Sequence, residues 1–318
     1  MSSSPPPYFD RAAIESAVSP LAARAAIAAL ASAGGLDGPQ RWSVPFGGGE
    51  LLLMPAAGAR LGGVKVVALP DHRRPPPAPL PGVQGLYVLF DNDTLAPVAL
   101  LDAAALTELR TAAVSAFVAD CLLPAGDIVA MLFGTGAQAR AHLVALDATR
   151  PLVEVLVVGR REEAVATMLA FAAAKGIAAR PATAEEVDRA GVVCCCTTSA
   201  EPLFDGARLA PGTHVIAVGS HRPTRREVDT TTVRRSFVVV ETRPAARREA
   251  GDLLVPLAEG AVESLPVDAD LAELAAGVRA DADADLTLFK SVGVAAEDLA
   301  VAEAVLAVAE AASTARGS

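Results

Sequence analysis

The feature that most constrains the fold is a glycine turn between a buried strand and a helix. An apolar run, DIVAMLF, is followed by GTGAQA at 134–139 and then by a segment whose apolar residues have helical spacing. A dinucleotide fold needs this order. Its first glycine makes the turn, the second lets the backbone approach a pyrophosphate, and the third position must be small. Gly134, Gly136 and Ala139 occupy these positions, and a plain strand–helix turn is the alternative interpretation.

The strand–helix pattern continues beyond this turn. The sequence predicts further apolar strands and helices that alternate along the chain. The strands are expected at 127–133, 153–160, 191–199, 213–220 and 236–242, and the helices at 137–148, at 162–175 and after a Thr183–Glu186 capping box. Continuous apolar strands that alternate with helices indicate a parallel sheet covered on both faces. We place this α/β unit at 119–291.

The two ends of the chain have a different pattern. The first 118 residues combine an alanine-rich helix at 12–34 with short glycine-punctuated strands, a proline-rich surface loop at 70–82 and a long helix at 100–122. The last helix, 295–313, has no strand after it. We therefore expect this helix to pack back onto the first 118 residues.

Composition excludes several classes of protein. The chain has 318 residues, of which 52% are hydrophobic, so it supports a large core divided between two domains. A net charge of −10 makes nucleic acid an unfavourable partner. The longest stretch without charged residues, Pro75 to Phe90, is shorter than a membrane helix of about 20 residues. The first residues have neither the basic nor the apolar region of a signal peptide, so we expect a cytoplasmic protein.

Three of the four cysteines are adjacent, at Cys194, Cys195 and Cys196. They form no CxxC pair, and they lie within an apolar strand that Thr197 and Thr198 end. We therefore expect them to act as small apolar residues in a reduced compartment, and we expect no metal site.

The end of the second strand selects the nucleotide. An acidic residue there suits the ribose of NAD, whereas a basic residue suits the additional phosphate of NADP. Arg160 and Arg161 stand at this point, with no carboxylate before Glu162. This favours NADP(H) over NAD, and the alternative is a pair of solvated arginines at a helix start.

Several segments spread along nearly the whole chain resemble the ornithine cyclodeaminase and mu-crystallin family. They are LLLMPA, GVKVV, LLDAAALTELRTAAVSA, GTGAQARAHL, GRREEA, TTSAEPLF, LAPGTHVIAVGS, RREVD, EAGDL and LTLFKSVGVAAEDLAVA. The resemblance implies a Rossmann doubly wound parallel sheet, 119–291, inserted into an α+β substrate and dimerisation domain, 1–118 plus 292–318. It also implies a homodimer that binds NAD(P) and acts on small α-amino or α-imino acids.

The same resemblance implies a substrate pocket with three basic residues. Arg41 and Arg110 would hold the substrate carboxylate, and Lys65 would lie beside the reacting carbon and nitrogen. The sequence around Arg110 is consistent with such a role, because a charged residue on an alanine-rich helix needs a partner or a ligand. Lys65 is flanked by valines, so it is either a desolvated functional amine or an outward residue of a half-exposed strand. With the resemblance we favour the functional amine.

The resemblance also implies the cofactor contacts. They are Gly134, Thr135, Gly136, Ala137, Gln138, Arg160, Thr197, Thr198 and Ser291. For Ser291 a chain-return loop is the competing interpretation. Glu297 and Asp298 are expected only to begin the last helix, where carboxylates favour the helix dipole.

Two departures from the family pattern indicate the subclass. Ornithine cyclodeaminases carry an acidic residue where this chain has Leu52, and an aspartate where AVGSHRP places Ser220 and His221. Both acids that would handle a diamine are missing, as they are in the imine-reducing branch. His221 is a candidate base near neutral pH, or else a loop histidine exposed to solvent.

We therefore predict NADPH-dependent reduction of a cyclic imino acid, pyrroline-2-carboxylate or piperideine-2-carboxylate, to L-proline or L-pipecolate. One alternative is another enzyme on the same scaffold, either an ornithine or lysine cyclodeaminase or an amino-acid dehydrogenase. A second alternative is a crystallin-like protein that binds NADP without turnover.

Overall fold

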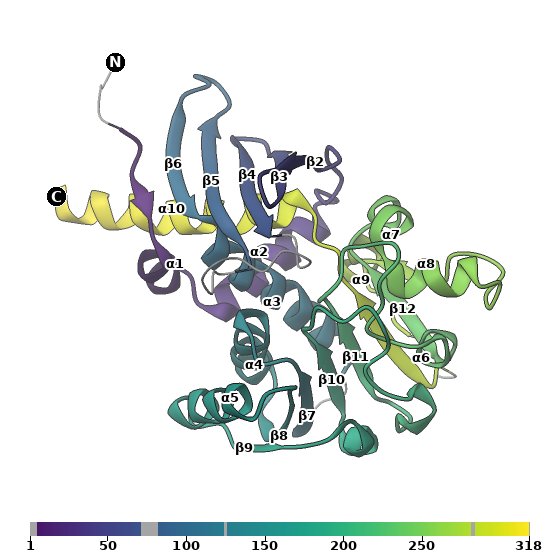
Figure 1. The fold of residues 1–318 in the computed structure, drawn as a ribbon. Coiled ribbons are helices and arrows are strands. Elements are labelled where there is room, and N and C mark those ends of the chain that lie inside the picture. The colour runs from purple at the N-terminus through teal and green to yellow at the C-terminus, as the bar shows by residue number, and fades with distance from the viewer. Residues whose placement is uncertain (1–4, 71–81, 124–125, 281–283, 318) are drawn as a thin grey trace. The chain divides into compact units, whose positions relative to one another are not determined.

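The chain forms two compact units. The structure is a computed structural model that describes residues 5–70, 82–123, 126–280 and 284–317, so most of the proline-rich loop expected at 70–82 lies outside the described residues. The first unit comprises Met1–Arg110 with Val294–Ser318, and the second comprises Thr111–Gly293 (Figure 1). The unit boundary near residue 110 lies inside one continuous helix, α3, whereas the sequence placed it eight residues later.

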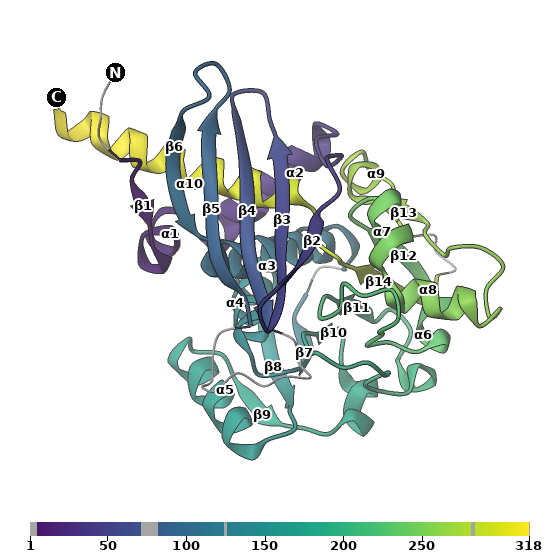
Figure 2. The same ribbon diagram turned by 45° about the horizontal axis from the view of Figure 1, so that its top comes forward.

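The first unit is built on a six-stranded sheet with the order β1-β6-β5-β4-β3-β2. Its strands are β1 (Tyr8–Phe9), β2 (Trp42–Phe46), β3 (Gly49–Ala57), β4 (Leu61–Pro70), β5 (Gln84–Asp91) and β6 (Pro97–Asp102). Its helices are α1 (Arg11–Ala17), α2 (Pro20–Ser32), the start of α3 (Ala103–Leu122) and α10 (Ala295–Gly317). Neighbouring strands from β2 to β6 are antiparallel. Helix α10 crosses one face of this sheet and packs against α2, β3 and β4 (Figures 1 and 2).

The second unit is a parallel sheet of eight strands with the order β13-β12-β14-β11-β10-β7-β8-β9. The strands are β7 (Ile128–Phe133), β8 (Leu152–Val158), β9 (Ala179–Pro181), β10 (Val192–Cys195), β11 (His214–Ala217), β12 (Ser236–Val240), β13 (Ala269–Asp270) and β14 (Leu286–Lys290). The helices are α4 (Ala137–Thr149), α5 (Glu162–Ala174), α6 (Thr230–Arg235), α7 (Arg243–Glu249), α8 (Gly251–Ala258) and α9 (Leu271–Ala275), with short 3₁₀ turns at Ala184–Arg189 and Gly206–Arg208. Every strand pair in it is parallel, which confirms the doubly wound α/β class.

The last strand in sequence, β14, lies in the middle of this sheet. It pairs with β11 on one side and with β12 on the other. We expected LTLFK in this unit but predicted no strand for it, because Thr287 and Lys290 interrupt its apolar run. The central position explains why Lys290 is fully buried.

Two predicted helices have different limits from those expected. The helix expected at 12–34 is broken into α1 and α2, whose axes differ by 75°. The break has a local cause: Ser19 caps α2 by accepting a hydrogen bond from the amide of Ala22, and Pro20 lacks the N–H that a continuous helix would need. The helix expected from residue 100 begins only at Ala103, because 97–102 form strand β6.

The third predicted helix of the alternating unit is a 3₁₀ turn. Its predicted capping box between Thr183 and Glu186 is present. Six residues follow the cap before Ala190 returns to an extended conformation, so the turn does not grow into an α-helix.

Among the described residues, no single helix is long and apolar enough to cross a membrane. Only α1 and α2 taken together reach the required length and hydropathy, and they are bent at their junction.

The glycine turn gives a prediction about stability. Gly134 has φ = +112°, and a Cβ added there would lie 2.6 Å from the carbonyl oxygen of Cys196. Gly134→Ala should therefore lower the free energy of unfolding by about 1–3 kcal/mol from backbone strain alone, as measured by urea unfolding. The matched control is Gly136→Ala, since a Cβ at Gly136 meets nothing within 4 Å and should change stability by less than about 1 kcal/mol. Equal losses in both variants would contradict this explanation.

Candidate functional site

Lys65 lies on the buried face of the sheet in the first unit. Side chains of β4 alternate between buried and partly exposed, and Lys65 is on the same face as Leu61 and Val67. The lysine is 2% exposed and pairs across the ladder with Met54 and Tyr87. The side chain of Lys65 therefore lies on the buried face of the sheet, and the outward orientation that the sequence left open is not observed.

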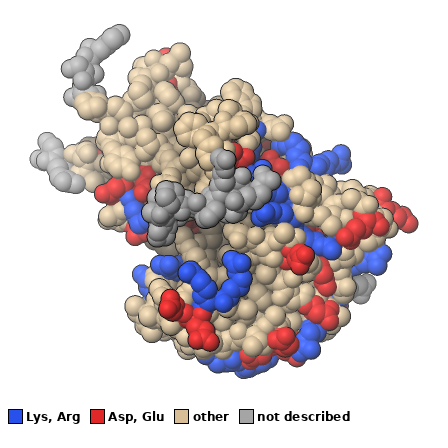
Figure 3. All heavy atoms as spheres, in the orientation of Figure 1, with Lys and Arg blue, Asp and Glu red and all other residues tan. Residues whose placement is uncertain are grey.

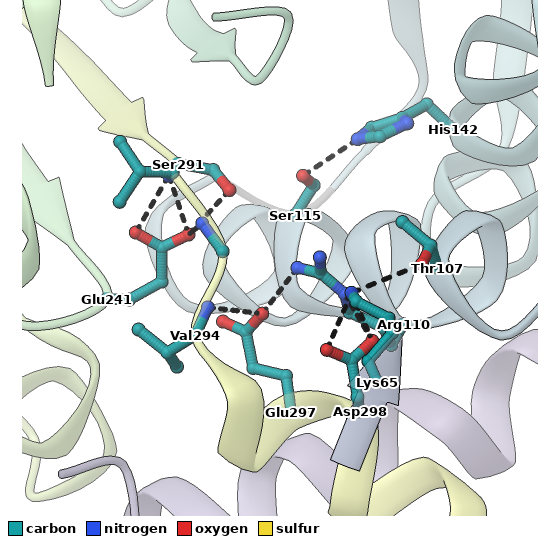
Figure 4. A network of polar contacts seen from close by, with 12 residues as sticks. Lys65, Thr107, Arg110, Ser115, His142, Glu241, Ser291, Val294, Glu297 and Asp298 are labelled. Atoms are coloured by element: carbon teal, nitrogen blue, oxygen red, sulfur yellow. Dashed lines mark hydrogen bonds and ion pairs between the residues drawn. The ribbon is translucent and has the colours of Figure 1, made fainter. Parts of the chain in front are cut away.

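The amine of Lys65 contacts a carboxylate from the other end of the chain. Nζ lies 2.9 Å from Oδ1 and 2.7 Å from Oδ2 of Asp298, and 3.2 Å from Oγ1 of Thr107 (Figure 4). Burial lowers the pKa of Lys65 to about 8, against the opposing effect of the Asp298 charge. A lysine with this pKa can exchange a proton near neutral pH.

Arg110 belongs to the same cluster. Its Nε donates to Oδ1 of Asp298 at 3.1 Å, and its Nη1 donates to Oε2 of Glu297 at 2.6 Å. The arginine is 6% exposed, and both carboxylates are fully buried. The buried partner that the sequence required for Arg110 is therefore present.

Glu297 and Asp298 have a larger part in this cluster than the sequence indicated. They lie in the first turn of α10, as expected, and Glu297 also accepts a hydrogen bond from the amide of Val294. Their side chains pair with Arg110 and Lys65, which are 187 and 233 residues away. The expectation of helix-dipole chemistry alone was incomplete. Two buried cations in the first third of the chain were the signal that two carboxylates had to come from elsewhere.

The surroundings of the cluster are basic on balance. Arg41, just before β2, is half-buried, and its charge lowers the pKa of Lys65. Three formal positive charges (Lys65, Arg110, Arg41) face two formal negative charges (Glu297, Asp298), which leaves one positive charge. An excess of one positive charge suits a ligand with a single carboxylate.

Leu52 occupies the position where a cyclodeaminase has its acid. It is 5% exposed and belongs to an apolar cluster with Val67 and Ala103. This cluster packs as hydrophobic core of the first unit.

The glycine turn of the second unit is open at the start of α4. Gly136 is the N-cap of this helix and makes no side-chain capping hydrogen bond. Gly136 and Ala137 are exposed, and Thr135 and Gln138 are half-buried. Amides at an uncapped helix start can bind an anion, so the turn fits a pyrophosphate.

Arg160 and Arg161 lie directly after β8 and are exposed. Arg161 is the N-cap residue of α5, again without a side-chain capping bond. Basic side chains are visible on the face of the protein drawn in Figure 3. Because both arginines are exposed, their side chains are accessible to a ligand at the end of β8.

One buried carboxylate connects the ends of two neighbouring strands. Oε1 of Glu227 accepts hydrogen bonds from the amide and the hydroxyl of Thr197, both at 2.7 Å. Oε2 accepts from the amide of Gly219, also at 2.7 Å. Thr197 follows β10 and Gly219 follows β11, so Glu227 fixes the sheet edge at which ligands bind in parallel sheets. Thr198, the next residue, is exposed.

Glu227 is in turn held by the buried carboxylate of Asp252, which itself pairs with the buried amine of Lys290. Oδ1 of Asp252 accepts from the amides of Glu227 and Val228, at 2.6 and 3.0 Å. Lys290 lies 2.7 Å from Oδ2 of Asp252 and donates to the carbonyl of Ser220 at 2.7 Å. The segments RREVD, EAGDL and LTLFK contain these three residues, to which we assigned no roles from the sequence. Only Lys290 stands out as a charge at the end of an apolar segment, whereas Glu227 and Asp252 lie in charged segments.

Ser291 is held by a second buried carboxylate. Its hydroxyl donates to Oε1 of Glu241 at 2.5 Å, and Oε1 also accepts from the amides of Val292 and Gly293, at 3.0 and 2.8 Å (Figure 4). The hydroxyl therefore fixes the loop after β14.

His221 lies in the loop after β11 and is half-buried, so it is not the fully exposed loop histidine that was one alternative.

Fold and site geometry together define a protein with a dinucleotide-type parallel sheet and a separate unit that carries a buried cluster of charged residues. The sequence profile of the ornithine cyclodeaminase/mu-crystallin family matches residues 13–313, and the chain belongs to this family. It is 36% identical over 238 residues to a Delta(1)-pyrroline-2-carboxylate reductase from Colwellia psychrerythraea. The aligned region covers 71% of this chain and 74% of that protein.

Two solved structures are similar over almost the whole chain. One is the Thermococcus litoralis Delta(1)-pyrroline-2-carboxylate reductase in complex with NADH and L-proline, with a TM-score of 0.88, 28% identity, and coverage of 96% of this chain and 98% of that one. The other is an archaeal alanine dehydrogenase dimer with bound NAD, with a TM-score of 0.88, 29% identity and 96% coverage of both chains.

The Lys65–Asp298 pair gives a prediction about proton affinity. Asp298→Asn removes the negative charge that raises the pKa of Lys65, so that pKa should fall below about 8. The chain has three lysines, Lys65, Lys175 and Lys290, so ¹³C-labelled lysine gives three signals to titrate by NMR. The exposed Lys175 is the internal control and should not shift. An unchanged or raised Lys65 midpoint would contradict the assignment.

Proposed function

We propose that this protein is a nicotinamide-dependent oxidoreductase that reduces the C=N bond of a cyclic imino acid. The substrates would be pyrroline-2-carboxylate or piperideine-2-carboxylate, and the products L-proline or L-pipecolate. The observation that carries the proposal is the buried cluster of Lys65 and Arg110 with Glu297 and Asp298, to which the nearby Arg41 adds one positive charge. The reductase names of the relatives support the same class of substrate.

The residues of the first unit would bind the substrate and move its proton. Arg110 and Arg41 would hold the carboxylate, which fixes the ring and makes the reaction effectively intramolecular. Lys65, which is mostly protonated at pH 7 with a pKa of about 8, would donate a proton to the imine nitrogen. Asp298 would position the ammonium group. The cofactor supplies the hydride that reduces the imine carbon.

Leu52 argues against cyclodeamination of ornithine or lysine. A cyclodeaminase must hold a second, cationic amine, and Leu52 is buried among apolar side chains. Amino-acid dehydrogenation is the second candidate, because one similar structure is an alanine dehydrogenase. His221 stays a candidate base for the cyclodeaminase alternative only.

A substrate panel tests the proposed reaction. We expect NADPH oxidation with pyrroline-2-carboxylate or piperideine-2-carboxylate, and at least tenfold lower kcat/KM with pyruvate plus ammonia. We expect no ammonia from ornithine with catalytic NADP. Arg110→Lys keeps the charge but loses the two-pronged carboxylate contact, so KM should rise for carboxylated imines. If pyruvate plus ammonia is the best substrate, the dehydrogenase alternative is correct. If no substrate turns over, the protein is a nucleotide binder.

We infer that the second unit binds the cofactor and that the cofactor is NADPH. The contacts would be Gly134, Thr135, Gly136, Ala137, Gln138, Arg160, Arg161, Thr197, Thr198 and Ser291. The open helix start suits the pyrophosphate, and the two exposed arginines suit a 2′-phosphate. NAD is the alternative, because the two similar structures carry NADH and NAD. In this proposal, residues 1–118 and 292–318 bind the substrate and form the dimer contact.

Cofactor preference gives a quantitative prediction. A charged hydrogen bond to phosphate contributes about 1.5–3 kcal/mol, so kcat/KM should favour NADPH over NADH by about tenfold or more. Arg160→Ala should reduce the preference by lowering kcat/KM for NADPH alone. Arg208→Ala is a matched control, since Arg208 is exposed in the same unit and pairs with Asp188. Equal values for NADPH and NADH in the parent protein would contradict the assignment.

We also propose a homodimer in the cytoplasm. Strand β2 ends the sheet of the first unit, and three alternate side chains along it are exposed and apolar: Trp42 (64%), Val44 (45%) and Phe46 (59%). Such a row on an edge strand is favourable only when it is covered. No disulfide links the four cysteines, which suits a reducing compartment.

The dimer proposal is tested by sedimentation velocity. Phe46→Asp should convert a dimer into a monomer or raise the dissociation constant at least tenfold, because it places a charge in a buried apolar contact. Val153→Asp is the control, because Val153 is an exposed apolar residue of the second unit. A parent protein that sediments as a monomer would overturn the proposal.

A further inference from the structure

A second cluster of reactive side chains lies inside the second unit. His142 comes from α4, Cys194 from β10, and Cys196 directly follows β10. Because the two cysteines are two residues apart in extended chain, their side chains lie on the same side. Their Sγ atoms are 3.6 Å apart, and the ligand atoms of all three residues lie within 4.8 Å of one another.

The histidine is oriented as a metal ligand would be. Its Nδ1 lies 2.8 Å from the backbone carbonyl of Gln138, which accepts a hydrogen bond and so fixes the proton on Nδ1. Nε2 is then the lone-pair nitrogen, and it lies 2.9 Å from Oγ of Ser115 (Figure 4). Ser115 and His142 are fully buried.

We propose that His142, Cys194 and Cys196 form a binding site for one thiophilic divalent cation, zinc. Two thiolates and an imidazole are a common ligand set for zinc, with Zn–S distances of about 2.3 Å. Sulfur atoms on a tetrahedral ion with such bonds are about 3.8 Å apart, so the observed 3.6 Å needs almost no rearrangement.

The charge balance favours a dication at this position. A cysteine binds a metal ion as its thiolate, and a buried site must compensate the charge of each thiolate. Zinc binding releases one proton from each thiol. The product, one dication with two thiolates and neutral ligands, has no net charge and can therefore stay buried.

This site lies next to the glycine turn. The carbonyl of Cys196 packs against Gly134, and Cys196 directly precedes Thr197. A bound ion would connect the end of β10 to helix α4, which begins at the turn. This consequence rests on the proposed function: if the turn binds the cofactor, zinc should change the affinity for NADPH, whereas zinc binding itself requires no cofactor.

The test is a metal titration of the reduced full-length protein. Co²⁺ should give the visible bands of a tetrahedral site and a thiolate charge-transfer band at one equivalent. Zn²⁺ should remove these bands at one equivalent. Cys196→Ser should weaken Zn²⁺ binding at least tenfold in competition with a chromophoric chelator. Cys195→Ser is the matched control, since Cys195 points to the opposite face of the strand and should leave Zn²⁺ affinity unchanged.

Three outcomes overturn the proposal. The first is a parent protein that binds no Co²⁺ or Zn²⁺ at micromolar protein concentration. The second is Cys196→Ser with parental affinity, and the third is equal weakening by Cys195→Ser. If Cys196→Ser does not fold, the parent Co²⁺ spectrum decides, because its charge-transfer intensity reports whether thiolates bind the ion. Failure of NADPH turnover would affect the proposed function alone and leave the metal titration valid.

Discussion

The carboxylate of Asp298, held between Lys65 and Arg110, is the interaction on which the first unit depends. All three side chains are almost fully buried, and burying any one of these charges alone would cost several kcal/mol. Lys65 comes from the central sheet, Arg110 from α3, and Asp298 from the last helix. The chain therefore has to bring its two ends together before any of these charges is compensated. This requirement explains why one compact unit combines residues 1–110 with 294–318.

The second unit meets a similar constraint with Glu227, Asp252 and Lys290. Lys290 ends β14, which lies between β11 and β12, so its amine arrives in the interior beside Asp252. Asp252 then orients the backbone of Glu227, whose carboxylate holds the ends of β10 and β11. A strand late in the sequence thus fixes the geometry of a sheet edge that the earlier strands β10 and β11 form.

Local patterns predicted the elements whose cause is local. The turn at Gly134 and the strands and helices around it were predictable, because apolar periodicity and glycine act within a few residues. Strand β14 was not predicted, since Thr287 and Lys290 interrupt its short apolar run. The break at Pro20 had a local signal, Ser-Pro, which the alanine-rich composition on both sides obscured.

The sequence predicted the site's cations better than its anions. Lys65 and Arg110 stood out as charges in apolar surroundings, whereas Glu297 and Asp298 had a sufficient local explanation as a helix start. Only tertiary contacts distinguish a carboxylate that faces the helix dipole from one that pairs with a buried amine. The same limit applied to His142, because its two cysteine neighbours are more than 50 residues away.

In the proposed reaction, the charge balance of the first unit also controls the timing of proton transfer. Burial, together with the positive charges of Arg110 and Arg41, lowers the pKa of Lys65. A bound substrate carboxylate compensates the excess positive charge, so it should raise the pKa of Lys65 and keep the amine protonated until the imine nitrogen accepts the proton. Transfer of one proton and one hydride leaves a neutral amine in the ring and a neutral amine on Lys65. When both amines take up a further proton from solvent, two positive charges lie side by side. Lys65 therefore opposes retention of the product ammonium and promotes its release.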